Sequence, residues 1–185
     1  MVANFYEIKD LTLFIPKVHN DERGYFMESY KKEIFDKLLG KNIDFIQDNE
    51  AKSTKNTLRG LHYQKPPFAQ TKLIRCVSGC ILDIVVDLRM RSDTFGESKV
   101  IELSDSNKHQ LLVPTGFAHG YFVKSEIAIV NYKVDNVYSP AHESGLKFDD
   151  QDINIEWPIN IEKILLSKKD KLLESLKEYV KHPCF

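Results

Sequence analysis

The chain has 185 residues, 42% of them hydrophobic, which suits one compact domain that spans residues 1–185 and buries a sizeable core. Its 26 basic and 27 acidic residues leave a net charge of -1, and because no stretch concentrates Lys and Arg, the composition argues against a nucleic acid partner. The three cysteines form no CxxC pair and no apolar run is long enough for a signal peptide or a membrane span, so we expect a reduced, cytoplasmic protein without membrane association.

Short apolar or alternating runs, separated by turn residues, follow one another through most of the chain. This rhythm is typical of an all-β sandwich or barrel. The expected strands are Leu11–Val18, Tyr25–Tyr30, Thr57–Gln64, Lys72–Val77, Cys80–Leu88, Lys99–Leu103, Gln110–Val113 and Ile127–Val134.

Two segments predict helices that pack on the outside of the β core. The first is Lys31–Leu39, which Gly40 ends. The second is Ser167–Val180, where apolar residues recur at helical spacing, at Leu172, Leu173, Leu176 and Val180. No internal repeat or linker suggests a domain boundary.

Alternation within the strand Cys80–Leu88 separates two acids from its apolar residues. Asp83 and Asp87 share one face, and from periodicity alone we expect that face to be solvated. The alternative is that Asp83 faces a barrel interior. There it would need a partner, because an unpaired buried charge is costly, and Lys72 and Arg75 are the candidates.

The densest cluster of reactive residue types lies within residues 58–64, where Arg59 and His62 share one strand. Strict alternation puts these two on opposite faces, unless Gly60 marks a bulge that redirects them. A histidine can act as a base near neutral pH, with a carboxylate to orient it. The alternative is an ordinary strand histidine whose hydrogen bonds are satisfied.

A second histidine, His119, follows the turn at residues 114–116 and begins a further strand-like segment. Two histidines on neighbouring strands raise the question of a metal ion. However, His62-Tyr63-Gln64 stands where a metal-binding β-barrel would have a His-x-His pair, and no third ligand has a suitable spacing. We therefore expect no metal.

Two tyrosines are candidates for a general acid or for half-buried packing. A phenol can protonate a carbanion, and the six-residue separation of Tyr132 and Tyr138 would let them share a face if the strand continued that far. Ser139-Pro140 argues against such continuation. Tyrosines are also common packing residues of sheets.

Together these segments resemble the family of dTDP-4-dehydrorhamnose 3,5-epimerases, sugar epimerases of the cupin fold. Each motif is weak alone, but the ordered set is specific and runs from about Leu11 to Asp170. Its members are residues 21–28 (DERGYFME), 47–49 (QDN), 58–64 (LRGLHYQ), 69–73 (AQTKL), 83–89 (DIVVDLR), 114–120 (PTGFAHG), 131–133 (NYK), Tyr138 and 166–170 (LSKKD).

The resemblance implies a cupin-type β jelly roll with short peripheral helices, including one at the C-terminus. It implies a homodimer with exchanged N-terminal strands and a reaction that needs neither a metal nor any other cofactor. The substrate would be a dTDP-linked 4-keto-6-deoxyhexose, and the product would serve the synthesis of dTDP-L-rhamnose and surface polysaccharide.

The resemblance also assigns roles to individual residues. His62 is the base, paired with Asp170, and Tyr132 is the acid on the opposite face of the sugar. Lys72 stabilises the enolate oxygen, with Asp83 close by. The implied substrate-binding residues are Arg23 and Arg59 at the diphosphate, Tyr138 stacked on the base, and Glu28, Gln47, Asn49, Lys72, His119, Glu143 and Lys169 at the sugar or nucleotide.

Three alternatives stay open at this point. One is an epimerase of C3 alone or C5 alone, or a ketoisomerase, acting on another nucleotide-linked 4-keto sugar. Another is a jelly-roll module that binds a nucleotide sugar without catalysis. A metal-dependent oxygenase is the third. The presence of both His62 and Tyr132 favours epimerisation.

Overall fold

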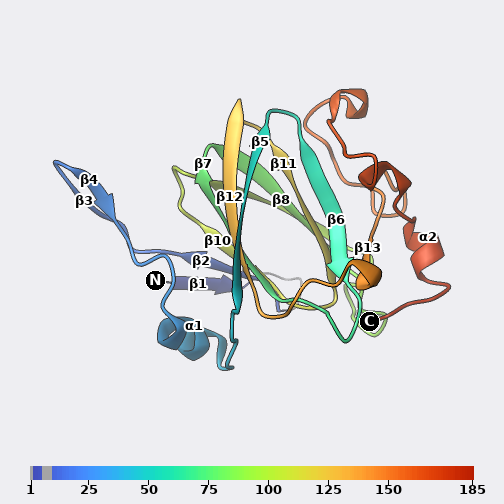
Figure 1. The fold of residues 1–185 in the computed structure, drawn as a ribbon, viewed down its shortest axis with the longest axis horizontal. Helices are drawn as coiled ribbons and strands as arrows, with labels where there is room; N and C mark the ends of the chain where they lie inside the picture. The colour runs from blue at the N-terminus through green and yellow to red at the C-terminus, as the bar shows by residue number, and fades with distance from the viewer. Residues whose placement is uncertain (1, 6–9) are drawn as a thin grey trace.

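Two antiparallel sheets face each other in the computed structural model, which describes residues 2–5 and 10–185 (Figure 1). The six-stranded sheet has the order β1 (Val2–Phe5), β2 (Thr12–Ile15), β10 (Gln110–Val113), β7 (Lys72–Ser78), β12 (Ile127–Val134) and β5 (Gln47–Thr54). The five-stranded sheet has the order β13 (Glu143–Gly145), β6 (Leu58–Gln64), β11 (Phe117–Val123), β8 (Cys80–Asp87) and β9 (Ser98–Ser104). The expected jelly-roll architecture is confirmed.

The remaining elements lie at the edges of this sandwich. A separate hairpin, β3 (His19–Asp21) with β4 (Gly24–Phe26), projects away from the two sheets near the N-terminus (Figure 1). The helices are α1 (Lys32–Leu39), α2 (Leu176–Tyr179) and the single turns η1 (Pro140–His142), η2 (Ile161–Lys163) and η3 (Asp170–Leu172). No helix in the described part of the chain is long and apolar enough to cross a membrane.

Three apolar clusters hold the elements together. One lies between the two sheets and includes Ile74, Val85, Leu111 and Val130. A second lies between the outer face of the five-stranded sheet and the C-terminal segment, and a third lies beneath α1. A strand that is covered on both faces can carry apolar side chains on both, so its sequence alternates little between apolar and polar residues.

Burial on both faces overturns the expectation that Asp83 and Asp87 are solvated. Both side chains are 0% exposed, on a strand whose other face packs against the C-terminal segment. Asp87 is compensated by hydrogen bonds from Arg89, Ser92 and Thr94, at 2.7 to 3.0 Å. Buried carboxylates are tolerated when their oxygens are paired in this way.

The first expected helix is confirmed, and the second is wrong as a continuous element. α1 ends at Gly40, whose φ of 66° is the left-handed conformation that glycine adopts readily. From residue 167 to residue 180 only η3 and α2 are helical, because Ser175 begins a new helix with a capping box to Glu178. The apolar residues at helical spacing therefore do not share one buried face: Leu173 and Leu176 are buried, whereas Leu172 is 85% exposed.

One long strand, β5, was missed because its sequence, QDNEAKST, has almost no apolar residues. It forms the edge of the six-stranded sheet, and among the described residues it pairs only with β12, so most of its side chains contact solvent. Edge strands are commonly polar or charged, because an apolar edge promotes aggregation. The pairing partner, rather than the residue pattern, makes this segment a strand. The short strands β1, β3 and β13 were also not expected.

Candidate active site

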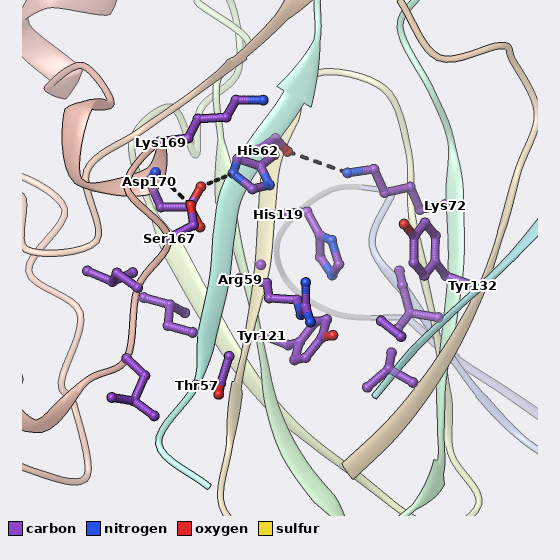
Figure 2. A pocket seen from close by; sticks show the side chains of 17 residues that line it. Thr57, Arg59, His62, Lys72, His119, Tyr121, Tyr132, Ser167, Lys169 and Asp170 are labelled. Atoms are coloured by element: carbon purple, nitrogen blue, oxygen red, sulfur yellow. Dashed lines mark hydrogen bonds and ion pairs between the residues drawn. The ribbon is translucent and has the colours of Figure 1, made fainter. Parts of the chain in front are cut away.

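A cavity of about 520 Å³ opens between the two sheets and contains most of the expected catalytic residues. Its walls come from β6, β7, β11 and β12, and the segment 165–170 closes one side (Figure 2). The polar side chains that line it are Thr57, Arg59, His62, Lys72, His119, Tyr121, Tyr132, Ser167, Lys169 and Asp170.

A bulge between β6 and β11 puts Arg59 and His62 on the same wall of the cavity. His119 pairs with His62 and Tyr121 with Arg59, so two residues on β6 stand opposite one on β11. Gly60 has a φ of 131°, and a Cβ there would lie 2.6 Å from the Cα of Gly120. Only two glycines allow this close approach, which settles the question that alternation left open.

His62 is held by Asp170. Its Nε2 atom lies 2.6 Å from Asp170 Oδ1, and the other ring nitrogen points into the cavity (Figure 2). Burial alone would raise the pKa of Asp170, but the hydrogen bonds from His62 and Ser167 outweigh this effect and hold the pKa below its usual value. The carboxylate is therefore charged at neutral pH and fixes the orientation of the imidazole ring.

Lys72 lies on the opposite sheet, with its Nζ atom 3.5 Å from the carbonyl oxygen of His62. Burial lowers the pKa of Lys72 to about 8, although the negative charges of Asp83 and Glu143 partly oppose the shift. The ammonium group thus retains its charge near neutral pH, in a site with little water to screen it.

Asp83 lies behind the cavity wall and contacts His119. Both of its carboxylate oxygens are within 3.0 Å of His119 Nε2. The partners expected for Asp83 were Lys72 and Arg75. Lys72 interacts with it only through charge, and Arg75 lines a separate cavity of about 180 Å³. His119 was missed as the partner because β11 and β8 meet only in the folded sheet, where Tyr121 is opposite Asp83.

Tyr132 stands across the cavity from His62, on β12 of the other sheet (Figure 2). Its ring packs against the core cluster between the sheets. Burial raises the pKa of the phenol, and the neighbouring Arg59 guanidinium only partly counteracts this. The hydroxyl group is therefore protonated at neutral pH.

Three of the expected substrate-binding residues form a cluster at the rim. Glu143 accepts a hydrogen bond from the Tyr138 hydroxyl and forms an ion pair with Lys169, which lines the cavity. Burial alone would raise the pKa of Glu143, but these contacts with Lys169 and Tyr138 lower it. The rim thus carries one negative and one positive charge beside an exposed aromatic ring.

The other four expected substrate-binding residues do not line this cavity. Arg23 is 91% exposed on the β3–β4 hairpin and pairs with Asp21. Glu28 is exposed beyond that hairpin. Gln47 and Asn49 lie on the edge strand β5, joined by a 2.8 Å hydrogen bond.

Sequence reasoning missed three polar residues of the cavity: Thr57, Tyr121 and Ser167. Tyr121 carried a usable signal, because it lies two residues beyond His119 and a strand places such residues on one face. Ser167 donates to the Asp170 carboxylate and accepts from its backbone N–H. In the described part of the chain, no three His, Cys, Asp or Glu side chains form a group that could hold a metal ion.

A half-buried histidine with its carboxylate lies on one wall, a protonated phenol lies on the other, and a lysine reaches in beside the histidine, so the site has groups that could transfer protons on both faces of a ligand. In a jelly roll, this arrangement defines the class of epimerases that act by proton transfer.

The comparisons with known proteins identify the family. The sequence profile described as dTDP-4-dehydrorhamnose 3,5-epimerase matches residues 6–178. The chain is 51% identical over 164 residues to the dTDP-4-dehydrorhamnose 3,5-epimerase of Shigella flexneri, which covers 89% of this chain and 90% of that protein. The chain belongs to the dTDP-4-dehydrorhamnose 3,5-epimerase family, and its activity is that of an isomerase of dTDP-rhamnose biosynthesis.

Solved structures agree. The crystal structure of the Elizabethkingia anophelis NUHP1 enzyme of the same name superimposes with a TM-score of 0.92 at 45% identity, covering 96% of this chain and 97% of that one. The Legionella pneumophila Philadelphia 1 epimerase, solved in complex with dTDP-4-keto-L-rhamnose, gives a TM-score of 0.91 at 39% identity, covering 95% and 93%. These likenesses confirm the expected family and fold.

Proposed function

We propose that this chain catalyses 3,5-epimerisation of dTDP-4-dehydro-6-deoxy-D-glucose with His62 as the base and Tyr132 as the acid. The observation that carries this proposal is the geometry of the cavity: the His62–Asp170 pair, joined at 2.6 Å, lies on one wall, and Tyr132 lies on the other (Figure 2). Inversion of a carbon centre requires a proton to leave from one face and another to arrive from the opposite face.

The chemistry needs only proton transfer. A ketone at C4 acidifies the hydrogens at C3 and C5, so His62 can take one of them and leave an enolate whose negative charge lies on the C4 oxygen. Tyr132 then donates its proton to the same carbon from the other face, and the ketone is restored. The reaction is redox-neutral and releases no group. After each inversion His62 gives its extra proton to water and Tyr132 takes one from water, so the site is ready for the second centre.

Lys72 is the group proposed to stabilise the enolate. Its ammonium reaches the cavity beside His62, and burial strengthens its attraction for a developing oxyanion. One well-aimed donor of this kind contributes about 3 to 4 kcal/mol to the transition state. Asp83 supports the site indirectly, through His119 and through its charge near Lys72.

The dTDP moiety is the part of the substrate that we propose contributes most to binding. The Legionella pneumophila relative was solved with dTDP-4-keto-L-rhamnose, and the present cavity offers cations for a diphosphate in Arg59 and Lys169. The exposed ring of Tyr138 at the rim suits stacking on a base. His119 and Glu143 supply further polar contacts at the wall and rim.

We propose that Arg23, Glu28, Gln47 and Asn49 complete the site in a homodimer with exchanged N-terminal strands. In the described chain the β3–β4 hairpin pairs only with itself, and β5 has a free edge. Addition of the hairpin to this edge in a second copy would bring Arg23 near Gln47 and Asn49 and cover Tyr25 and Phe26, which are 53% and 66% exposed.

The dimer is tested by light scattering. We expect two copies per particle, and Phe26→Asp, which puts a charge on the covered ring, should shift the equilibrium to monomers with lower activity. A wild-type monomer with full activity would contradict the dimer.

A cytoplasmic location is also proposed, and its support is that Cys76, Cys80 and Cys184 are all free thiols. Proteins of oxidising compartments usually pair their cysteines.

Proton NMR in D₂O tests the catalytic proposal. Wild-type protein with dTDP-4-dehydro-6-deoxy-D-glucose should give product with deuterium at both C3 and C5, and His62→Ala should give neither deuterium nor product. His109→Ala, a half-buried histidine outside the cavity, is the matched control and should behave as wild type. Turnover by His62→Ala at the wild-type rate would contradict the assignment of the base.

A further inference from the structure

Among the polar side chains that line the cavity, Tyr121 is the most buried one that the proposed reaction leaves without a role. It is 5% exposed, lies on β11 and lines the cavity directly opposite Arg59 in the β6–β11 ladder. Figure 2 shows its hydroxyl beside the Arg59 guanidinium, on the side of the cavity that faces Tyr132. A buried phenol normally has a hydrogen-bond partner, so its position calls for an acceptor.

Either hydroxyl can be the donor in the contact between Ser53 and Tyr121, and the hydrogen bonds around Ser53 allow the Tyr121 proton to point into the cavity. Arg59 donates from Nε to Ser53 Oγ at 2.9 Å, and the Ser53 and Tyr121 oxygens are 3.5 Å apart. With Ser53 as the donor in that contact, Tyr121 accepts one hydrogen bond and keeps its own O–H for an acceptor inside the cavity. Burial raises the pKa of Tyr121, so the hydroxyl stays protonated at neutral pH.

The same contacts fix the guanidinium group. Arg59 also donates from Nη2 to the carbonyl oxygen of Lys52 at 3.3 Å, so two of its nitrogens are anchored to β5. The third nitrogen, Nη1, has no hydrogen-bond partner in the described part of the chain and shares its wall with the Tyr121 hydroxyl. A fixed cation next to a neutral O–H donor is an arrangement that binds a phosphate oxygen.

We propose that Tyr121 is a second donor to the diphosphate of the nucleotide sugar, acting beside Arg59, and that Ser53 is the positioning residue that holds both. This inference rests on the proposed function, which places the diphosphate at Arg59. The inference adds a neutral donor that hydrogen-bonds to the diphosphate and does not contact the sugar or the base.

Binding of dTDP and thymidine separates this role from its alternatives. Tyr121→Phe removes only the hydroxyl, and we expect the Kd for dTDP, measured by calorimetry, to rise about tenfold, the scale of one hydrogen bond to a charged group. The Kd for thymidine, followed by NMR chemical shifts, should not change. In turnover, KM should rise by a larger factor than kcat falls.

Tyr63→Phe is the matched control. It removes another buried hydroxyl, which donates to Glu174 on the outer face of the same sheet, and it should leave dTDP binding as in wild type. Ser53→Ala should weaken dTDP binding in the same direction as Tyr121→Phe, since it releases Arg59.

Two results would overturn the inference: an unchanged Kd for dTDP in Tyr121→Phe, or an equal loss of affinity for dTDP and thymidine. Neither result touches the catalytic proposal, which is tested through variants of His62, Tyr132 and Asp170. Conversely, an active His62→Ala variant would overturn the assignment of His62 as the base. The dTDP affinities would still decide whether Tyr121 binds the diphosphate.

Discussion

Asp170→Asn is the substitution that tests the catalytic pair most directly. It keeps the size of the side chain but removes the negative charge that faces His62 Nε2 at 2.6 Å. In the proposed reaction His62 takes a proton from the sugar and becomes an imidazolium, and the Asp170 carboxylate would stabilise that charge. We therefore expect slower deprotonation with little change in substrate binding.

The magnitude follows from the charge separation. Two unit charges whose centres are about 4 Å apart interact by roughly 4 kcal/mol at an effective dielectric constant of about 20. Asp170 is 5% exposed but His62 is 28% exposed, so solvent screening reduces this to about 3 kcal/mol. The rate should then fall by roughly 10²-fold. An Asn amide that donates to Nε2 would also impose the wrong tautomer and increase the loss.

The assay is the initial rate of deuterium incorporation at C3 and C5, measured by proton NMR in D₂O at saturating substrate. Asp150→Asn is the matched control, because Asp150 is also buried and accepts backbone hydrogen bonds, from Asp152 and Leu176, but lies outside the cavity. It should lower the melting temperature without a change in rate per folded molecule. Asp170→Asn with exchange within threefold of wild type would refute the reasoning.

Three further predictions follow from the same geometry. Tyr132→Phe should still exchange substrate hydrogens but form product about 10² to 10⁴ times more slowly, and equal loss of exchange and product by NMR would contradict its role as the acid. Burial lowers the pKa of Lys72 to about 8, so its charge is present below that pH and lost above it. We therefore expect kcat/KM to fall as the pH rises through about 8. If the Lys72→Met variant shows the same fall, the titration belongs to another group. Gly120→Ala would put a Cβ 2.5 Å from the Arg59 carbonyl oxygen, so overpacking should cost about 2 kcal/mol and lower the melting temperature by roughly 4 to 8 °C, which circular dichroism would detect.

The sequence by itself determined the β class, most strand positions and α1. Apolar runs between turn residues are local features, and Gly40 ends its helix through its own backbone freedom. The ordered motifs also indicated the family and the proposed catalytic residues His62, Lys72, Tyr132 and Asp170, all of which line one cavity. Residue types at fixed places in the chain carry this information.

Only the tertiary structure decided which side chains meet. The periodicity of one strand gives no information about the neighbouring strand. It therefore could not predict that the polar segment β5 joins a sheet or that Asp83 is buried against His119. It also left Arg59 and His62 on opposite faces until the close approach of Gly60 and Gly120 produced the bulge. Long-range pairing and packing on both faces of a sheet set these contacts, and neither is encoded in the local pattern of residues.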